Sequence, residues 1–220
     1  MGPNSLHAKS FIEYHHLYNV IGFAVNEQYK AVDVFEDLPV FTLENLYNEV
    51  GSSNIKVFVS LLWNHLNRDR RNMYEFCKSK GYQMANLISP LSVIRSEITG
   101  DNMWIQDFAV IQNGCVLGSN IAMMQSTVLG TRCHIGSHCF FGAHSIVGGG
   151  SSVGEQTFVG FNATVFDGTK IGSKCIVGAC TVVKRNMPDC SKIITSSDFT
   201  IKQYAEDEVE NKLMFSKNKR

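Results

Sequence analysis

Three histidines stand close together in this chain and could carry out proton transfer: His134, His138 and His144. An imidazole has a pKa of about 6.5, so near neutral pH it can accept a proton from an attacking amine or hydroxyl group. Each histidine alone could equally be a polar residue tolerated at an exposed corner. Because three occur in one short segment, we treat them as a candidate proton-transfer site.

The histidines lie within a strict six-residue repeat. From Ile105 to Val183 every sixth residue is a sizeable apolar residue, fourteen in succession, and glycine follows it in nine of the fourteen cases. This period is too short for a repeat that contains a helix, and it suits very short strands joined by tight turns. At three repeats to a coil, the pattern predicts a parallel β-helix of four to five coils.

The first 88 residues lack this period and alternate apolar segments with helical ones. Strands are predicted at 20–25, 55–62 and 82–88. Helices are predicted at about 8–15, at 42–50 with Thr42 as N-cap, and at 68–80 with Gly81 as stop residue. This alternation indicates a small parallel α/β unit. Such a unit normally opens with an apolar strand, so its first strand is predicted to be missing or altered.

Three domains are therefore expected. They are an α/β domain at 1–88, a β-helix domain at 89–188 and a C-terminal region at 189–220. In the last region we predict a short strand at 193–195 and a helix at about 198–214, capped by Ser197.

Composition narrows the possible partners and the compartment. The chain has 20 basic and 20 acidic side chains, and this balance argues against binding to nucleic acid. It contains no apolar run of membrane-spanning length and no signal-peptide pattern, so no membrane insertion is expected. Four of its seven cysteines fall on one small-residue position of the repeat: Cys115, Cys133, Cys139 and Cys175. They are predicted to be reduced core residues, which indicates a cytoplasmic protein with no metal site.

The repeat at 105–188 resembles the hexapeptide-repeat, left-handed parallel β-helix acyltransferases. The preceding residues resemble one subgroup in the turn Leu38–Val40, the helix start at Asn67, the segment Lys80–Tyr82 and the segment 86–92. That subgroup consists of bacterial sugar acyltransferases related to sialic acid O-acetyltransferase and to the N-acetyltransferases of UDP-bacillosamine and GDP-perosamine synthesis. In it, a Rossmann-like domain precedes the β-helix.

The resemblance implies an acetyl-CoA-dependent acetyltransferase acting on a nucleotide-linked sugar in bacterial surface-glycan biosynthesis, such as that of the lipopolysaccharide O-antigen. It implies a homotrimer in which coenzyme A and the sugar meet between neighbouring β-helices. N-acetylation is the first expectation and O-acetylation the alternative.

The resemblance also suggests site residues, with one departure. The subgroup's usual base is a histidine at the position of Thr131, and a hydroxyl group cannot replace an imidazole as base. His138 matches a second histidine that contacts the acetyl group, and His144 matches a histidine found in some relatives. We therefore expect His138 to be the base, with His134 as the second candidate. An amine already partly deprotonated would need only positioning.

Further positions are implied for the acyl group and for the two substrates. A thioester under attack needs an N–H donor for its oxyanion, and the glycine run 148–150 could offer one. His144, Val147 and Gly148 are therefore expected in the acetyl and oxyanion region. The residues expected to bind coenzyme A are Gly160, Asn162, Gly178 and Lys184. Those expected to bind the sugar nucleotide are Ser5 and His7.

Two other functions fit a β-helix. One is a zinc hydratase of the γ-type carbonic anhydrase kind, which needs three histidine ligands from different coils. The spacings among His134, His138 and His144 do not supply them. The other is a non-catalytic scaffold or regulatory protein that has lost its base, which Thr131 would permit.

Overall fold

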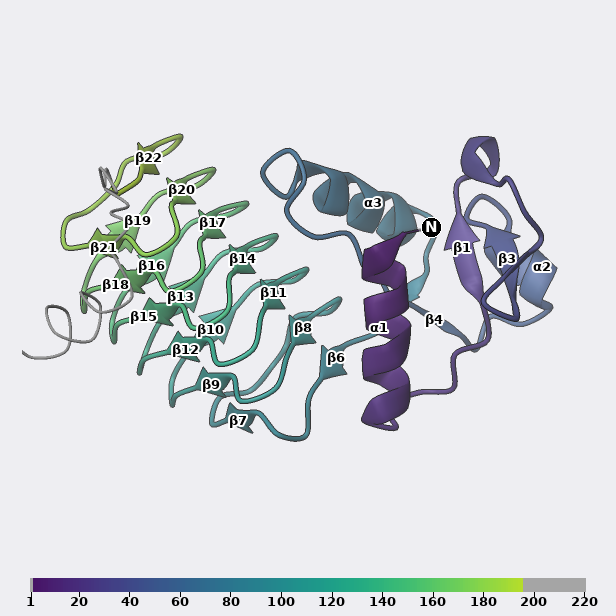
Figure 1. The fold of residues 1–220 in the computed structure, drawn as a ribbon, viewed down its shortest axis with the longest axis horizontal. Helices are drawn as coiled ribbons and strands as arrows, with labels where there is room; N and C mark the ends of the chain where they lie inside the picture. The colour runs from purple at the N-terminus through teal and green to yellow at the C-terminus, as the bar shows by residue number, and fades with distance from the viewer. Residues whose placement is uncertain (1, 196–220) are drawn as a thin grey trace, which may run out of the picture.

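The protein consists of a parallel β-helix with a small α/β part against its first coils (Figure 1). The computed structural model describes residues 2–195. The helix predicted at 198–214 lies outside these residues. Among those described, no helix combines the length and the apolar character that a membrane crossing requires.

Three sheets of two-residue strands form the β-helix. The seven-stranded sheet contains β6 (Leu87–Ile88), β8 (Trp104–Ile105), β11 (Ala122–Met123), β14 (Phe140–Phe141), β17 (Phe158–Val159), β20 (Ile176–Val177) and β22 (Lys192–Ile193). The six-stranded sheet contains β7 (Val93–Ile94), β9 (Val110–Ile111), β12 (Val128–Leu129), β15 (Ile146–Val147), β18 (Thr164–Val165) and β21 (Val182–Val183). The four-stranded sheet contains β10 (Val116–Leu117), β13 (His134–Ile135), β16 (Ser152–Val153) and β19 (Lys170–Ile171).

The register confirms three repeats to a coil. Val128 pairs with Ile146 in the parallel ladder, and the next coil repeats the step from Ile146 to Thr164. The ladder runs beyond the predicted repeat, from β6 before it to β22 after it. The side-chain period did not reveal these outer strands, because a ladder needs backbone pairing and not a strict apolar repeat.

Turns join the sheets at three corners of the coil. The first corner, exemplified by 137–139, joins the four-stranded sheet to the seven-stranded sheet. The second corner, as at 143–145, leads to the six-stranded sheet, and the third, as at 131–133, returns to the four-stranded sheet. One residue at each of these turns has a left-handed backbone, for example His138 with φ 65° and His144 with φ 59°.

The repeated apolar residues fill the interior of the coil. All fourteen are buried, with at most 4% of any of them exposed. Cys115, Cys133, Cys139 and Cys175 are buried between them as free thiols, as the repeat predicted. Glycine follows the apolar residue because neighbouring coils approach closely. A Cβ built on Gly136 would lie 2.6 Å from the backbone nitrogen of Glu155.

Within the described residues, the α/β part contains three α-helices, one 3-10 helix and two small sheets. In chain order its elements are α1 (Pro3–Tyr14), β1 (Phe23–Val25), the 3-10 helix Glu27–Tyr29, β2 (Val34–Phe35), β3 (Leu38–Thr42), α2 (Leu46–Val50), β4 (Lys56–Val57), α3 (Arg68–Ser79) and β5 (Gln83–Met84). Strand β3 pairs with β1 in parallel and with β2 antiparallel, while β4 and β5 form a separate parallel pair. The expected single parallel unit is therefore divided between two sheets.

The helix predicted at 42–50 begins later than expected. Thr42 ends β3, where it pairs with Val25, and the helix starts at Leu46. From the end of the strand, the amide and hydroxyl groups of Thr42 donate to the carboxylate of Glu49 in α2. The helix at Arg68–Ser79 agrees with its prediction.

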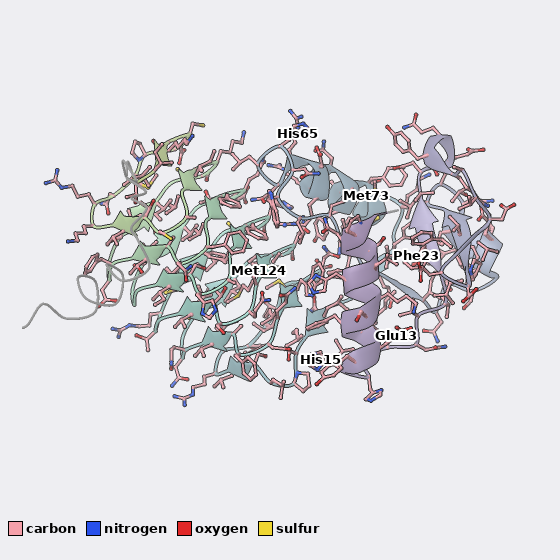
Figure 2. The ribbon with its side chains drawn as sticks, viewed as in Figure 1. Glu13, His15, Phe23, His65, Met73 and Met124 are labelled. Carbon is pink, nitrogen blue, oxygen red and sulfur yellow. The ribbon has the colours of Figure 1, made fainter. Side chains whose placement is uncertain are left out.

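The α/β part packs on the outer face of the seven-stranded sheet. Ala8 and Phe11 of α1 contact Trp104 and Phe140 in one buried cluster. His15, labelled in Figure 2, stands at the end of α1. Its Nε2 lies 2.8 Å from a carboxylate oxygen of Asp107. These contacts seat α1 against the first coils.

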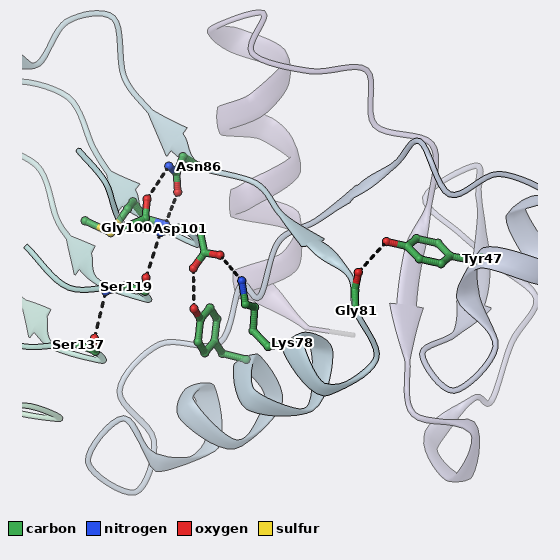
Figure 3. Close-up of polar contacts among 10 residues, drawn as sticks. Tyr47, Lys78, Gly81, Asn86, Gly100, Asp101, Ser119 and Ser137 are labelled. Atoms are coloured by element: carbon green, nitrogen blue, oxygen red, sulfur yellow. Dashed lines mark hydrogen bonds and ion pairs between the residues drawn. The ribbon is translucent and has the colours of Figure 1, made fainter. Parts of the chain in front are cut away.

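Helix α3 is attached to the solenoid by polar contacts. Lys78 Nζ lies 2.7 Å from Asp101 Oδ2, and Tyr74 donates its hydroxyl hydrogen to Asp101 Oδ1 at 2.6 Å (Figure 3). The guanidinium of Arg70 is fully buried and donates to the carbonyl oxygens of Leu62, His138 and Cys139. Burial lowers the pKa of Arg70 to about 10, so it keeps its charge at neutral pH.

Candidate active site

The structure does not bring the three histidines together. His134 lies in β13, on the outer face of the four-stranded sheet. His138 occupies the first corner and His144 the second. The three histidines are close in the sequence but not in space, because successive six-residue repeats lie on different sides of the coil. This separation also removes the three as a shared set of zinc ligands, and the described residues contain no group of three ligands that could hold a metal ion.

His138 is enclosed between the first corner and α3. Only 7% of it is exposed, and the ring of Tyr74 meets it edge-on at 5.6 Å between centroids. Burial, and then the positive charge of Arg71, lower the pKa of His138. The imidazole is therefore neutral at pH 7 and has little room for a substrate.

A chain of amides fixes which nitrogen of His138 carries hydrogen. The backbone N–H of Val59 donates to Oδ1 of Asn102 at 2.8 Å, which identifies the oxygen of that amide, and the amide nitrogen of Asn102 donates back to the Val59 carbonyl at 3.4 Å. That nitrogen donates to Oδ1 of Asn120 at 2.8 Å. The amide nitrogen of Asn120 then lies 2.8 Å from Nδ1 of His138, which must accept. The hydrogen of neutral His138 is thus on Nε2, and its one basic nitrogen is already bonded.

Asn102, Asn120 and His138 belong to a column of buried polar residues that the sequence analysis did not find, although the spacing of the column could have revealed it. Asn102, Asn120, His138 and Gln156 stand eighteen residues apart, at the same corner of successive coils. Polar residues repeated at one coil position, and buried there, indicate a surface covered by another part of the chain. Arg70 was missed as well, because a basic residue on a helix is usually solvated.

Thr131 stands at the third corner and His134 directly after it, at the start of β13. Both side chains are exposed. The side chain of His134 is exposed between its register partners Val116 and Ser152. Thr131 and Arg132 line a shallow hollow of about 350 Å³ at the preceding turn. His134 is thus the one predicted histidine with an accessible imidazole close to the position where relatives are expected to keep their base.

The three residues expected in the acetyl and oxyanion region lie at different places on the coil. His144 is exposed at the second corner, whereas Gly148 follows β15 at the start of the third. Val147 points into the core and is fully buried. The N–H of Gly148 donates to Val165, that of Gly149 to the Asp167 carboxylate, and that of Gly150 to Thr131. None of these three N–H groups is free for an oxyanion.

The residues expected to bind coenzyme A lie at two corners. Gly160 and Gly178 stack one coil apart, and both donate backbone N–H groups within the ladder. Asn162 is exposed at the second corner with φ 53°. Lys184 follows β21, and its ammonium lies 5.3 Å from the centre of the Phe166 ring. The six-stranded sheet separates Lys184 from the other three.

The two residues expected at the sugar nucleotide belong to α1. Ser5 donates its hydroxyl hydrogen to the Gly2 carbonyl at 2.7 Å and accepts the Gly2 N–H at 3.1 Å, which stabilises the helix start. The ring of His7 lies 5.0 Å from that of Trp104, and partial burial lowers the pKa of His7. Both residues have structural contacts that explain their presence.

Comparison with known proteins identifies the repeat. The family model for the hexapeptide repeat of succinyl-transferase matches residues 109–137, 134–155 and 150–185. No curated protein matches the chain.

Two solved structures extend the likeness to the α/β part. A mutant perosamine N-acetyltransferase from Caulobacter crescentus, in complex with CoA and GDP-perosamine, is 28% identical with a TM-score of 0.73. The match covers 84% of this chain and 88% of that one. The acetyltransferase domain of PglB from Neisseria gonorrhoeae, in complex with acetyl coenzyme A, is 23% identical with a TM-score of 0.73, over 86% and 92% of the two chains.

Fold and repeat define a hexapeptide-repeat, left-handed β-helix protein with a small α/β part in front. Within that class, the chain is similar to the perosamine and PglB acetyltransferases, as the sequence resemblance indicated.

Proposed function

We propose that this protein is an acyltransferase that moves the acetyl group of acetyl-CoA to the amine of a nucleotide-linked sugar. One observation carries the proposal. The likeness to an enzyme that holds CoA and GDP-perosamine extends through both parts of the chain, at 28% identity over 84% of its length. The α/β part, which a β-helix acyltransferase does not need for its fold, supports a nucleotide sugar as the acceptor.

The reaction requires an uncharged amine, a polarised thioester and an exit for the thiol. The amine attacks the carbonyl carbon, the C–S bond breaks, and the amine's proton must leave. We assign the proton acceptor to His134, because its imidazole is exposed beside the third corner. His138, whose Nδ1 already accepts from Asn120, becomes a structural residue. Thr131 can position an acceptor hydroxyl or amine by hydrogen bonding, but it cannot take the proton.

Self-association as a homotrimer is part of the proposal. The outer face of the six-stranded sheet carries an apolar stripe in which Val93, Ile146 and Val182 are 45%, 42% and 50% exposed. Val110 and Val128 continue the stripe between Val93 and Ile146, and Thr164 separates Ile146 from Val182. Contiguous apolar surface of this kind is typical of protein–protein interfaces. A partner on this sheet would lie next to the third corner and His134, so the substrates would bind between neighbouring β-helices.

The proposed setting is the bacterial cytoplasm, with the product entering surface-glycan biosynthesis such as that of the O-antigen. Free cysteines support a reducing compartment. Cys77 and the four core cysteines are buried thiols, and Cys180 and Cys190 are exposed thiols. O-acetylation of a sugar hydroxyl remains the alternative within the same class, since the same corner could serve either nucleophile.

A non-catalytic scaffold is the second candidate, favoured by one specific observation. Threonine stands at position 131, and the nearest buried histidine has its basic nitrogen occupied. Such a protein would bind coenzyme A poorly or would bind it without turnover.

The test is thiol release from acetyl-CoA with a panel of 3-amino and 4-amino sugar nucleotides, combined with calorimetric titration of coenzyme A. An enzyme of the proposed kind releases thiol with at least one amino sugar and not with the matching hydroxy sugar. Release only with hydroxy sugars would indicate O-acetylation. Absence of both release and coenzyme A binding would overturn the proposal in favour of the scaffold.

A further inference from the structure

The turn that joins β4 to α3 has an unusual backbone. His65, Leu66 and Asn67 have φ values of 49°, 55° and 62°, so three successive residues other than glycine are left-handed. Elsewhere in the described chain, left-handed residues other than glycine stand singly, except for the pair Glu36 and Asp37. Because this region is disfavoured for residues with a Cβ, such a run persists only where its surroundings fix it.

Hydrogen bonds hold both ends of this turn. At its start, the buried guanidinium of Arg70 donates to the carbonyl oxygen of Leu62 at 3.1 Å. At its end, the carbonyl oxygen of Leu66 accepts from the side-chain amide of Gln156 in the solenoid at 3.1 Å. Asn67 is fully buried, and its side-chain amide donates to a solenoid carbonyl at 3.2 Å. The protein itself thus fixes the turn, so the side chains on it are preorganised for a ligand.

The turn presents Trp63 at the surface, where it is 41% exposed. Its indole meets the ring of Phe140 at 4.9 Å between centroids with the planes 62° apart, and that of Phe161 at 6.4 Å with the planes 89° apart. Phe140 and Phe158, by contrast, are stacked with their planes 6° apart. Within residues 2–195, no aromatic ring lies parallel to Trp63 and no cation lies over it. Steeply inclined contacts therefore orient the indole and leave part of it open to a planar ring.

The place of the turn in the fold indicates the kind of ligand. Strand β4 is paired in parallel with β5, and the chain continues from it through 58–62 into the turn, so Trp63 lies beyond the carboxyl end of a parallel strand (Figure 1). Ligands of parallel α/β units bind beyond these ends. Asn64 and His65, the latter labelled in Figure 2, follow Trp63 and are exposed. An aromatic face with an amide and an imidazole next to it in the turn can stack a base and bond to the base's edge.

We propose that Trp63 is the stacking platform for the base of the sugar nucleotide. The proposal rests on the proposed function, because it takes the acceptor to be linked to a nucleotide. Stacking on an aromatic ring tolerates every base, so selection among bases falls to hydrogen bonds from Asn64 and His65. Coenzyme A also carries a base, its adenine. We assign Trp63 to the sugar nucleotide because the turn belongs to the α/β part, and the test separates the two sources.

The test uses the purified full-length chain and its own tryptophan fluorescence. The chain has two tryptophans, and because Trp104 is 1% exposed, a stacked base quenches Trp63 alone. The ligands are GDP, UDP, CDP and dTDP, with coenzyme A as the second source of a base. Calorimetry gives the affinities of wild type, Trp63→Leu and Trp63→Phe. The matched control is Phe108→Leu, which removes a 61% exposed ring at the second corner. Circular dichroism shows whether each variant is folded.

The proposal predicts that at least one nucleoside diphosphate quenches the fluorescence and binds Trp63→Leu about 10-fold more weakly than wild type. Trp63→Phe, which keeps a ring, should lose less affinity, and Phe108→Leu should lose none. The affinity for coenzyme A should be the same in all four proteins.

Two results would overturn the proposal: no quenching by any of the four diphosphates, or equal diphosphate affinity in wild type and Trp63→Leu. A loss of affinity confined to coenzyme A would also overturn it, since Trp63 would then serve the adenine. Quenching in wild type and the affinity of Trp63→Phe decide the matter if Trp63→Leu does not fold. None of these measurements involves acetyl transfer, so failure of the proposed function is detected separately, by thiol release.

Discussion

The side-chain amide of Asn120 donates a hydrogen bond of 2.8 Å to Nδ1 of His138, and this contact decides the chemistry of that histidine. The orientation of the Asn120 amide is set by Asn102, and that of Asn102 by the backbone N–H of Val59. A histidine that sequence reasoning placed first as general base is therefore a member of a buried polar column between the solenoid and α3.

Replacing His138 should change stability more than activity. In His138→Ala the buried Asn120 amide loses its acceptor, which costs about 1–3 kcal/mol of unfolding free energy. We expect a lower midpoint in urea unfolding and a kcat within about threefold of wild type, because the residue does not contact the reacting atoms. A loss of kcat of ~100-fold or more in a folded His138→Ala variant would return His138 to the catalytic role.

The same histidine should make stability depend on pH in a defined direction. Burial, and then the charge of Arg71, hold the pKa of folded His138 below its usual value of 6.5, so the unfolded chain binds the proton more readily. Its contribution to stability is complete above the unfolded pKa and is lost as the pH falls through 6.5 toward the folded pKa. Urea unfolding of wild type and His138→Gln between about pH 5 and 8, the range where histidine titrates, measures the difference. Parallel pH profiles for the two proteins would contradict the assignment.

Asn120→Asp should reverse the protonation of His138. A carboxylate cannot donate to Nδ1, so Nδ1 must carry a hydrogen, and the added negative charge favours the imidazolium form. NMR titration of the imidazole should therefore give a higher pKa for His138 in this variant than in wild type. Asn120→Leu, which adds no charge, is the matched control. A pKa that stays low in Asn120→Asp would mean that the Asn120 contact does not govern His138.

His134→Ala should reduce turnover without reducing stability. Removal of a general base lowers kcat by about 10²–10⁴, and the exposed side chain contributes little to packing. His144→Ala, at a different corner, is the matched control and should leave kcat unchanged. The measurement is steady-state thiol release with the best substrate of the panel. An unchanged rate in His134→Ala would mean that the amine needs only positioning.

A charge on the apolar stripe should dissociate the proposed trimer. In Ile146→Glu a carboxylate replaces a 42% exposed apolar residue at the centre of the six-stranded sheet. Burying that charge against a neighbour would be strongly unfavourable, so light scattering should report a monomer. Lys170→Glu, on the exposed face of the four-stranded sheet, should keep the wild-type mass. A trimer in Ile146→Glu would place the interface elsewhere.

The β-helix and its three repeats to a coil could be predicted from the sequence, because every coil needs an inward-pointing apolar residue at the same positions. Residues such as Ile105, Phe141 and Val183 must point inward and stack, and this leaves a period in the chain that needs no other information. The start of α2 at Leu46 could not be predicted, because Thr42 pairs with Val25 in the sheet and this is a contact between distant segments.

The site could be predicted only in part. The repeat gives the phase of His134 and His138, but it does not say which corner another part of the chain will cover. Burial of His138 depends on α3 and on Arg70, which reach it from 68 residues away. The glycine run 148–150 is predicted from the sequence to offer an N–H donor to an oxyanion, but all three N–H groups are bonded within the solenoid. In the structure, a Cβ on Gly148 would lie 2.5 Å from the backbone nitrogen of Asp167, so close stacking of coils already requires glycine there.

The most direct test of the account is the mass of the product. The protein is incubated with acetyl-CoA and a 4-amino sugar nucleotide, and the sugar nucleotide is then analysed by mass spectrometry before and after mild alkali. The account predicts a gain of one acetyl group that survives alkali, because an amide has formed. A sugar nucleotide of unchanged mass across the whole panel, with acetyl-CoA intact, would contradict it.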